Sequence, residues 1–229
     1  MSTHIRSETD LDEALAALVK ADPRFAALIA QAGRPPLRRR PDGFAGLAAT
    51  VVSQQLSTAS AGAIWSRLAA AFDPFDPAAI IRARTARLAR LGLSAPKIRA
   101  LKKIARATES GALALATLAE LAAEEAHAAL TAVHGIGPWT ADIYLLACLG
   151  HADAWPAGDL ALQEAARLAF GLKARPNAKE MDALAESWRP WRAVAARVLW
   201  TYYRALKGRD GAPTANHLPA KRKSKAETS

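Results

Sequence analysis

Cysteine is almost absent from the sequence, since Cys148 is its single example among 229 residues. One thiol excludes an intrachain disulfide, a zinc site built from four cysteines and an iron-sulfur cluster held by four cysteines. It is typical of a protein from a reducing compartment, so we expect a cytoplasmic location.

Long apolar runs are also missing. No stretch approaches the roughly 20 uninterrupted apolar residues that span a bilayer, and residues 1–15 lack the apolar core of a signal peptide. No segment joins a wide apolar face to a strongly basic one, as a helix lying on a membrane would. We therefore expect a soluble protein without a membrane partner.

Acidic residues are the minority among the charges. The chain has 31 Lys and Arg against 21 Asp and Glu, which gives a formal net charge of +10. Such a surplus attracts polyanions, of which nucleic acid and anionic membranes are the usual ones. Basic residues in the middle of the chain are candidates for phosphate contacts: Lys97, Lys102 and Lys103.

Alternation of apolar and polar residues, the pattern of a half-buried strand, does not occur. Alanine and leucine dominate, and the clear periodicity is that of helices, so the sequence predicts an all-α fold. Helix starts are indicated by caps and by prolines in the first turn. These signals are Asp22 with Pro23, Asp76 with Pro77, Ser94, Thr117 with Glu120, and Asn177 with Glu180.

The clearest local motif is a tight helical hairpin at residues 130–141. Gly135 and Gly137 bracket Ile136, and Pro138 suits the first position of the next helix. Backbone N–H groups of this turn and of the first helical turn, up to Thr140, lack helical partners and form an anion cup suited to one DNA phosphate. The alternative is a plain αα-hairpin with a glycine turn.

The same hairpin offers backbone oxygens to a monovalent cation. The carbonyls of Thr131, Val133 and Ile136 are left unpaired by the predicted turn. We expect a structural sodium or potassium ion there as an option, and no cofactor that the protein requires.

An aspartate follows the hairpin in a loop rich in Gly and Pro, Trp155–Asp159. Asp159 directly precedes an amphipathic segment, so it lies at a helix N-terminus, where the helix dipole favours the charged carboxylate. Aspartate is also a common N-cap, which is the alternative interpretation. Two other acids near the hairpin, Asp142 and Asp153, are expected on the polar surface.

In combination, these motifs resemble the helix-hairpin-helix DNA glycosylase superfamily, and within it the 3-methyladenine DNA glycosylase II branch. The resemblance covers residues 40 to 205. It also rests on residues 52–57, which resemble the segment that plugs the duplex, and on residues 188–192, which resemble the helix closing the pocket. One departure is Ile143, where this branch often has an aromatic residue, with Tyr144 next to it.

The resemblance implies a role for several residues. Asp159 takes the place of the catalytic carboxylate, and Gln55 or Leu56 takes that of the wedge that fills the gap left by a flipped base. The alternative for the segment around Gln55 and Leu56 is a capped turn with a half-buried leucine. Trp139 stands where lyase members have a nucleophilic lysine, which argues against lyase activity. Aromatic faces attract a cationic base, and the candidates for the base pocket are Trp139, Trp200, Tyr144 and Tyr202; Trp188 and Trp191 are expected in the core.

The function expected from this resemblance is a monofunctional glycosylase of base excision repair. It would hydrolyse the N-glycosidic bond of alkylated purines of the 3-methyladenine and 7-methylguanine type in double-stranded DNA by base flipping. Two alternatives remain open. One is a non-catalytic helix-hairpin-helix DNA-binding protein, and the other is a glycosylase for a neutral damaged base such as hypoxanthine, which would need a protonating group.

The expected architecture is two helical subdomains with a DNA-binding cleft between them. Residues 1–40 pack with 176–208 as one subdomain, and 41–175 form the other, with the helix-hairpin-helix at 117–149. Residues 209–229 are expected to be a basic, disordered tail. We expect a monomer associated with the nucleoid.

Overall fold

The computed structural model describes residues 4–207, and the predicted basic tail lies outside them. Every regular element in this part of the chain is a helix, and the pairing of extended backbone is limited to an isolated bridge between His4 and His151. The predicted all-α fold is confirmed. Within residues 4–207, no helix combines the length and the apolarity that crossing a bilayer requires.

The helices follow one another with short connections. They are α1 (Glu8–Ala21), α2 (Arg24–Ala32), α3 (Gly43–Ser53), α4 (Thr58–Ala71), α5 (Pro77–Arg82), α6 (Thr85–Arg90), α7 (Ala95–Glu109), α8 (Ala123–Thr131), α9 (Pro138–Tyr144), the π-helix η1 (Leu145–Leu149), α10 (Leu160–Ala169), α11 (Ala178–Ala185), the 3-10 helix η2 (Glu186–Trp188) and α12 (Arg192–Lys207).

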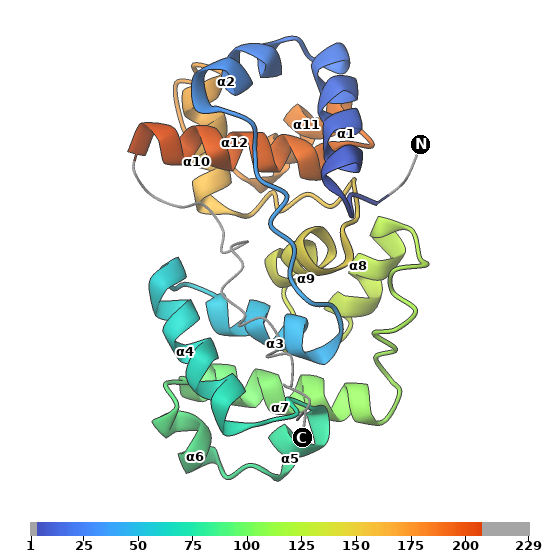
Figure 1. The fold of residues 1–229 in the computed structure, drawn as a ribbon, viewed down its shortest axis with the longest axis vertical. Helices are drawn as coiled ribbons and strands as arrows, with labels where there is room; N and C mark the ends of the chain where they lie inside the picture. The colour runs from blue at the N-terminus through green and yellow to red at the C-terminus, as the bar shows by residue number, and fades with distance from the viewer. Residues whose placement is uncertain (1–3, 208–229) are drawn as a thin grey trace, which may run out of the picture.

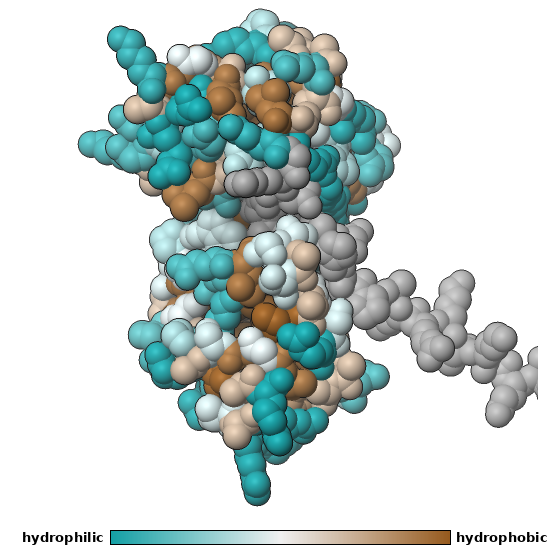
Figure 2. All heavy atoms as spheres, turned by 90° about the vertical axis from the view of Figure 1, so that its left-hand side faces the viewer, coloured by the Kyte–Doolittle hydropathy of each residue, from teal (hydrophilic) through white to brown (hydrophobic). Residues whose placement is uncertain are grey.

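Two lobes share these helices (Figure 1). In the upper lobe α12 packs against α10, α2 and α1, and in the lower lobe α7 packs against α5 and α3. The chain crosses between the lobes in the extended segment 33–42, beside α9. Viewed from the side, the lobes meet at a waist (Figure 2). The expected division assigned residues up to 175 to the lower subdomain, whereas α10 packs on α12 in the upper lobe.

Local capping signals account for several of the helix starts. Asp76 accepts a hydrogen bond from the N–H of Ala79, and Asn177 forms a reciprocal capping box with Glu180. The box predicted from Thr117 and Glu120 is wrong, because residues 115–120 form turns and the helix begins only at Ala123. Ser94 is the N-cap residue of α7, but its side chain makes no capping hydrogen bond.

A buried arginine ties the crossing segment to the π-helix. Arg197 of α12 donates hydrogen bonds to the carbonyl oxygens of Leu37 and Leu146, and it is 4% exposed. Arg39 donates to the carbonyl of Cys148 at 2.7 Å. Because a π-helix leaves its last carbonyls without helical partners, these guanidinium groups stabilise the junction between the lobes.

Candidate active site

A pocket of about 500 Å³ lies where three chain segments from the two lobes meet. The turn between α3 and α4, the first turn of α9 and the start of α10 each contribute one side of it. Its lining residues are Ser53, Gln54, Gln55, Leu56, Gly137, Pro138, Trp139, Thr140, Gly158, Asp159, Leu160 and Ala161. The structure thus brings together the predicted wedge, hairpin and aspartate, which are far apart in the sequence.

Asp159 is the only ionisable residue among those that line this pocket. It caps α10, and its Oδ1 accepts a hydrogen bond of 2.8 Å from the N–H of Leu162. Two indole N–H groups also donate to the carboxylate: Trp139 to Oδ2 at 2.8 Å and Trp200 to Oδ1 at 3.2 Å. Three donors and the N-terminus of α10 stabilise a negative charge on a side chain that is 7% exposed.

The loop that carries Asp159 is itself fixed by the helix that follows it. The side-chain amide of Gln163 donates to the carbonyl of Ala157 at 2.8 Å, and the N–H of Asp159 bonds to the carbonyl of Pro156 at 2.9 Å. Gln163 is 6% exposed. The position of the carboxylate therefore depends on α10, and Gln163 is not among the site residues predicted from the sequence.

The predicted hairpin joins α8 to α9 between Thr131 and Pro138. Gly135 has φ +107, and a Cβ there would meet Cα and Cβ of Ala100 at 3.0 Å. Ile136 is 4% exposed and packs between the helices, as predicted. Gly137 is exposed, and a Cβ on it would meet no atom within 4 Å. The hairpin therefore presents a backbone surface next to the pocket, and its phosphate contact stays a prediction.

Thr140 occupies a different environment from the other hairpin residues. Its side chain is 1% exposed, and its hydroxyl accepts a hydrogen bond of 2.7 Å from the side-chain amide of Gln54. Because the side chain is buried, only the backbone N–H of Thr140 is available to bind a phosphate. The side chain instead connects the hairpin to the wedge turn.

The four predicted base-pocket aromatics are not all at the pocket. Trp139 lines it, whereas Trp200 does not, although the indole N–H groups of both donate to Asp159. Tyr144 is fully buried in the core, so its predicted place at the pocket is wrong. It lies five positions after Trp139, which turns it about 140° around the helix, toward the core side of α9. Tyr202 is also buried, in α12, and does not line this pocket.

The wedge candidates lie at the tip of the turn between α3 and α4. Gln55 is exposed and has φ +55, a left-handed conformation that few residues other than glycine adopt. Leu56 is half-buried, and its N–H bonds to the carbonyl of Ser53 at 3.3 Å. Of the two, Gln55 is the more exposed.

Two of the three lysines predicted to contact phosphate have partners inside the protein. Lys97 donates to the carbonyls of Val52 and Gln54, and Lys102 donates to those of Ile81 and Ala83. Each ammonium group caps the C-terminal end of a helix or the turn that follows it, and the phosphate contact of these two lysines stays a prediction. Lys103 is exposed.

With this geometry established, comparison with known proteins assigns the family. The model of the HhH-GPD superfamily of base excision DNA repair proteins matches residues 48–190. The chain belongs to this superfamily. The alkylbase DNA glycosidase-like protein mag2 of Schizosaccharomyces pombe is 26% identical over 200 residues, which are 84% of this chain and 94% of that protein. The DNA-3-methyladenine glycosylase 1 of the same yeast is 36% identical over 154 residues, 66% of this chain and 68% of the relative.

A solved HhH-GPD structure has the same fold. The 3-methyladenine DNA glycosylase Mag1 of S. pombe, in complex with abasic DNA, superposes with a TM-score of 0.74 at 29% identity. The match covers 84% of this chain and 95% of that one. The resemblance deduced from the hairpin and the aspartate loop is confirmed.

The three carbonyls predicted to bind a cation in this HhH-GPD hairpin are not all left unpaired by the turn, so that part of the prediction is wrong for Val133. Thr131 ends α8, and the carbonyl of Val133 already accepts the N–H of Ile136 at 3.0 Å. A carbonyl oxygen has two lone pairs, so this bond leaves one for an ion. The cation itself stays a prediction.

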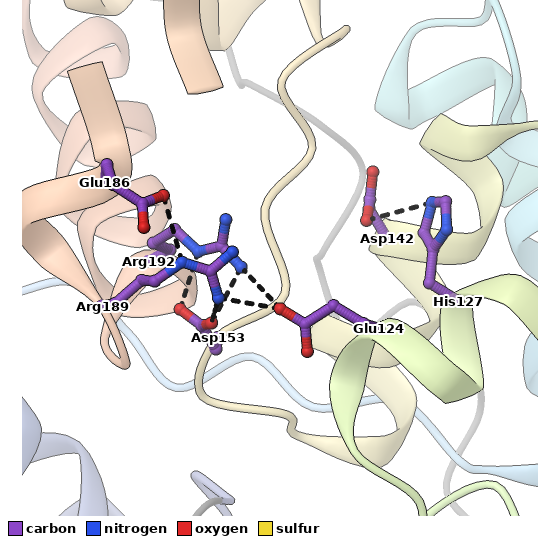
Figure 3. A network of polar contacts seen from close by, with 7 residues as sticks. All are labelled: Glu124, His127, Asp142, Asp153, Glu186, Arg189 and Arg192. Atoms are coloured by element: carbon purple, nitrogen blue, oxygen red, sulfur yellow. Dashed lines mark hydrogen bonds and ion pairs between the residues drawn. The ribbon is translucent and has the colours of Figure 1, made fainter. Parts of the chain in front are cut away.

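A second pocket, of about 730 Å³, adjoins the first and shares Pro138, Trp139 and Gly158 with it. Figure 3 shows its charged groups, in which Arg189 and Arg192 both pair with Asp153 and Glu124. Because both guanidinium groups are neutralised by these acids, the network stabilises the contact between α12 and the loop that leads to Asp159.

Asp142 also lines the second pocket, so its predicted place on the polar surface is wrong. Its side chain is 14% exposed, and one carboxylate oxygen lies 3.6 Å from Nε2 of His127. Burial, and then the charge of Asp182, raise the pKa of Asp142 well above its usual value. Asp153, also expected on the surface, is 16% exposed within the arginine network. Asp142 follows Trp139 by three residues, and this helical spacing was the available signal.

Proposed function

We propose that this protein is a DNA glycosylase that removes alkylated purines by hydrolysing their N-glycosidic bond. One observation supports this above all: a single carboxylate, Asp159, held by three N–H donors at the wall of a pocket between the wedge turn and the hairpin. A protein that only binds DNA has no use for an anion there, since it would repel the phosphates.

The chemistry follows from the charge that develops on the sugar. As the bond between base and deoxyribose breaks, the sugar becomes oxocarbenium-like and positively charged. The carboxylate of Asp159 stabilises that charge and orients the attacking water. Because its donors already fix its position, the group does not have to reorganise during the reaction.

The residues lining the Asp159 pocket favour a base that is already cationic. Asp159 is the only acid that lines the pocket, and the lining residues include no histidine or lysine. A purine alkylated at N3 or N7 carries a positive charge and leaves without protonation, whereas a neutral base such as hypoxanthine leaves poorly without an acid. The indole face of Trp139, which lines the pocket, adds cation–π attraction for a charged ring.

We infer a monofunctional enzyme without lyase activity. A lyase forms a Schiff base between a lysine and the sugar, and no residue lining the pocket is a lysine. We further propose that the enzyme acts as a monomer on double-stranded DNA in the cytoplasm, associated with the nucleoid, and that it requires no cofactor.

The test compares wild-type protein with Asp159→Asn on DNA that contains 7-methylguanine and 3-methyladenine. Asparagine is as good an N-cap as aspartate, so the fold should persist while the charge is lost. We expect base release to fall by a factor of about 100 or more, as for other groups that stabilise charge in the transition state. Equal release by both proteins contradicts the proposal, and release of hypoxanthine at a similar rate contradicts the preference for cationic bases.

The lyase question needs a separate assay. After complete base release, the abasic strand should remain intact until it is heated in alkali, and borohydride should trap no covalent adduct. Strand cleavage by the protein without alkali contradicts the monofunctional proposal while leaving the glycosylase intact.

A further inference from the structure

The turn that contains the predicted wedge is held by contacts from two other helices. It leaves α3 at Ser53 and enters α4 at Thr58. A helix end exposes its last four carbonyl groups, which require other partners. At the end of α3 the carbonyls of Thr50, Val51 and Ser53 bond within the segment itself, to groups of residues 53, 54 and 56.

The remaining carbonyl, that of Val52, is bound by a residue from α7. Nζ of Lys97 lies 2.7 Å from it and 2.8 Å from the carbonyl of Gln54. One ammonium group thus bridges the last turn of α3 and the turn that follows it. Lys97 is half-buried, and burial lowers its pKa.

The carbonyl of Gln54, which Lys97 also binds, lies directly before Gln55, a residue with positive φ. The oxygen of Gln54 belongs to the peptide group whose N–H is that of Gln55, and Gln55 has φ +55. A left-handed conformation costs a non-glycine residue free energy, and it persists only where the surroundings impose it. By fixing the orientation of the peptide between residues 54 and 55, Lys97 opposes relaxation of Gln55 to an ordinary conformation.

The side chain of Gln54 holds the same turn from the other side. Its amide donates to the buried hydroxyl of Thr140 at 2.7 Å. Thr140 belongs to the first turn of α9, directly after the hairpin. The tip of the turn is therefore connected to α7 through the backbone and to α9 through a side chain.

We propose that Lys97 is a positioning residue for base flipping, which holds Gln55 in the conformation that enters the duplex. The inference rests on the proposed function. Lys97 acts through the wedge turn and touches neither the base nor the sugar. The effect of removing Lys97 should therefore be larger when the target base is paired and the wedge must help to extrude it, and smaller when the base is unpaired.

The test uses Lys97→Met, which keeps an unbranched side chain up to the ε position but removes the ammonium group. Arg99→Met is the matched control, because it removes one positive charge from an exposed position of the same helix. The substrates are two duplexes with 7-methylguanine, one opposite cytosine and the other opposite an abasic analogue, where less pairing has to be broken. Single-turnover base release is measured on both.

We expect Lys97→Met to slow release from the paired duplex by about tenfold or more, and from the unpaired one by less than about threefold, since extrusion of an unpaired base costs less. Arg99→Met should slow both by the same small factor. The salt dependence of binding to undamaged DNA separates positioning from direct phosphate contact. A lost phosphate contact reduces its slope by about 1, whereas loss of a positioning residue leaves the slope unchanged.

A double-mutant cycle with Gln55→Ala tests whether the effect passes through the wedge. If it does, Lys97→Met should slow release from the paired duplex by less than about threefold in the Gln55→Ala background, because residues that act as a unit are not additive. Equal slowing on both duplexes, full additivity with Gln55→Ala or a reduced salt slope would each overturn the inference. Absence of base release by the wild-type protein would instead contradict the proposed glycosylase function.

Discussion

The indole N–H of Trp139 donates a hydrogen bond of 2.8 Å to Oδ2 of Asp159, twenty residues further along the chain. The bond joins the hairpin that faces the pocket to the carboxylate proposed to act on the sugar. Trp139 therefore contributes in two ways: its ring lines the pocket, and its N–H donates a hydrogen bond to the carboxylate of Asp159.

The donor function of Trp139 can be separated from its ring. Trp139→Phe keeps an aromatic face but removes the N–H, and one donor to the carboxylate is lost. We expect the single-turnover rate of base release to fall by about tenfold, as for loss of one hydrogen bond to a charged group.

Trp155→Phe is the matched control for this change. Trp155 lines the adjoining pocket, and its buried indole N–H has no hydrogen-bond partner. Its substitution should leave the rate within about twofold, since no hydrogen bond is lost. Equal effects of the two substitutions would show that the N–H of Trp139 is unimportant.

The two hairpin glycines should respond differently to alanine. In Gly135→Ala the new Cβ meets Ala100 at 3.0 Å in a left-handed conformation, so we expect a loss of stability of about 1–3 kcal/mol. In Gly137→Ala the Cβ has open space, and stability should change by less than about 0.5 kcal/mol.

The affinity of the Gly137→Ala protein for DNA tests whether Gly137 lies next to the DNA backbone. If a phosphate approaches the backbone at Gly137, the methyl group of Gly137→Ala weakens binding to undamaged DNA although the protein remains stable. Fluorescence anisotropy and thermal unfolding measure the two properties. Wild-type affinity of Gly137→Ala would argue against a phosphate at this position.

A buried contact between the N-terminal helices and η2 should contribute to stability. Asp22 accepts the indole N–H of Trp188 at 2.9 Å and a pair of hydrogen bonds from Arg24, and the bonds from Arg24 are the main cause that lowers its pKa to about 2. Asp22→Ala leaves the N–H of Trp188 buried without an acceptor, so we expect a loss of about 1–3 kcal/mol in denaturant unfolding. Asp12→Ala, which breaks an exposed pair with Arg34, should cost less than about 1 kcal/mol. Similar losses would contradict this assignment.

Stability should fall in mild acid because of two neighbouring histidines. Burial, and then the charge of His151, lower the pKa of His4 to about 4, and burial also lowers the pKa of His151. An unfolded histidine has a pKa of about 6.5, so below that pH the unfolded state binds more protons than the folded state. The contribution of His4 to stability is therefore complete above pH 6.5 and decreases as the pH falls toward 4.

Thermal unfolding between pH 7.5 and pH 4.5 measures this effect. In His151→Gln the decrease should be smaller, because one buried titrating group and its repulsion of His4 are gone. The exposed His134 provides the control, and His134→Gln should follow the wild-type curve. An unchanged slope in His151→Gln would show that other groups determine the acid sensitivity.

The sequence by itself determined the helices, the glycine hairpin, the polar joint at residues 53–57 and the aspartate at the start of α10. These features depend on periodicity, caps and turn residues within a few positions of one another, which is why they can be recognised locally. The helix start predicted from the capping pattern of Thr117 and Glu120 is wrong, because residues 115–120 form turns.

Only the tertiary structure decided which side chains meet. The convergence of Trp139 and Trp200 on Asp159, the bridge from Lys97 to the wedge turn and the burial of Tyr144 and Asp142 all depend on how helices from different parts of the chain pack. Packing fixes the rotation of each helix about its axis, and a rotation of about 100° per residue separates a pocket residue from a core residue. The sequence contains the helical period but not the direction from which the neighbouring helix approaches.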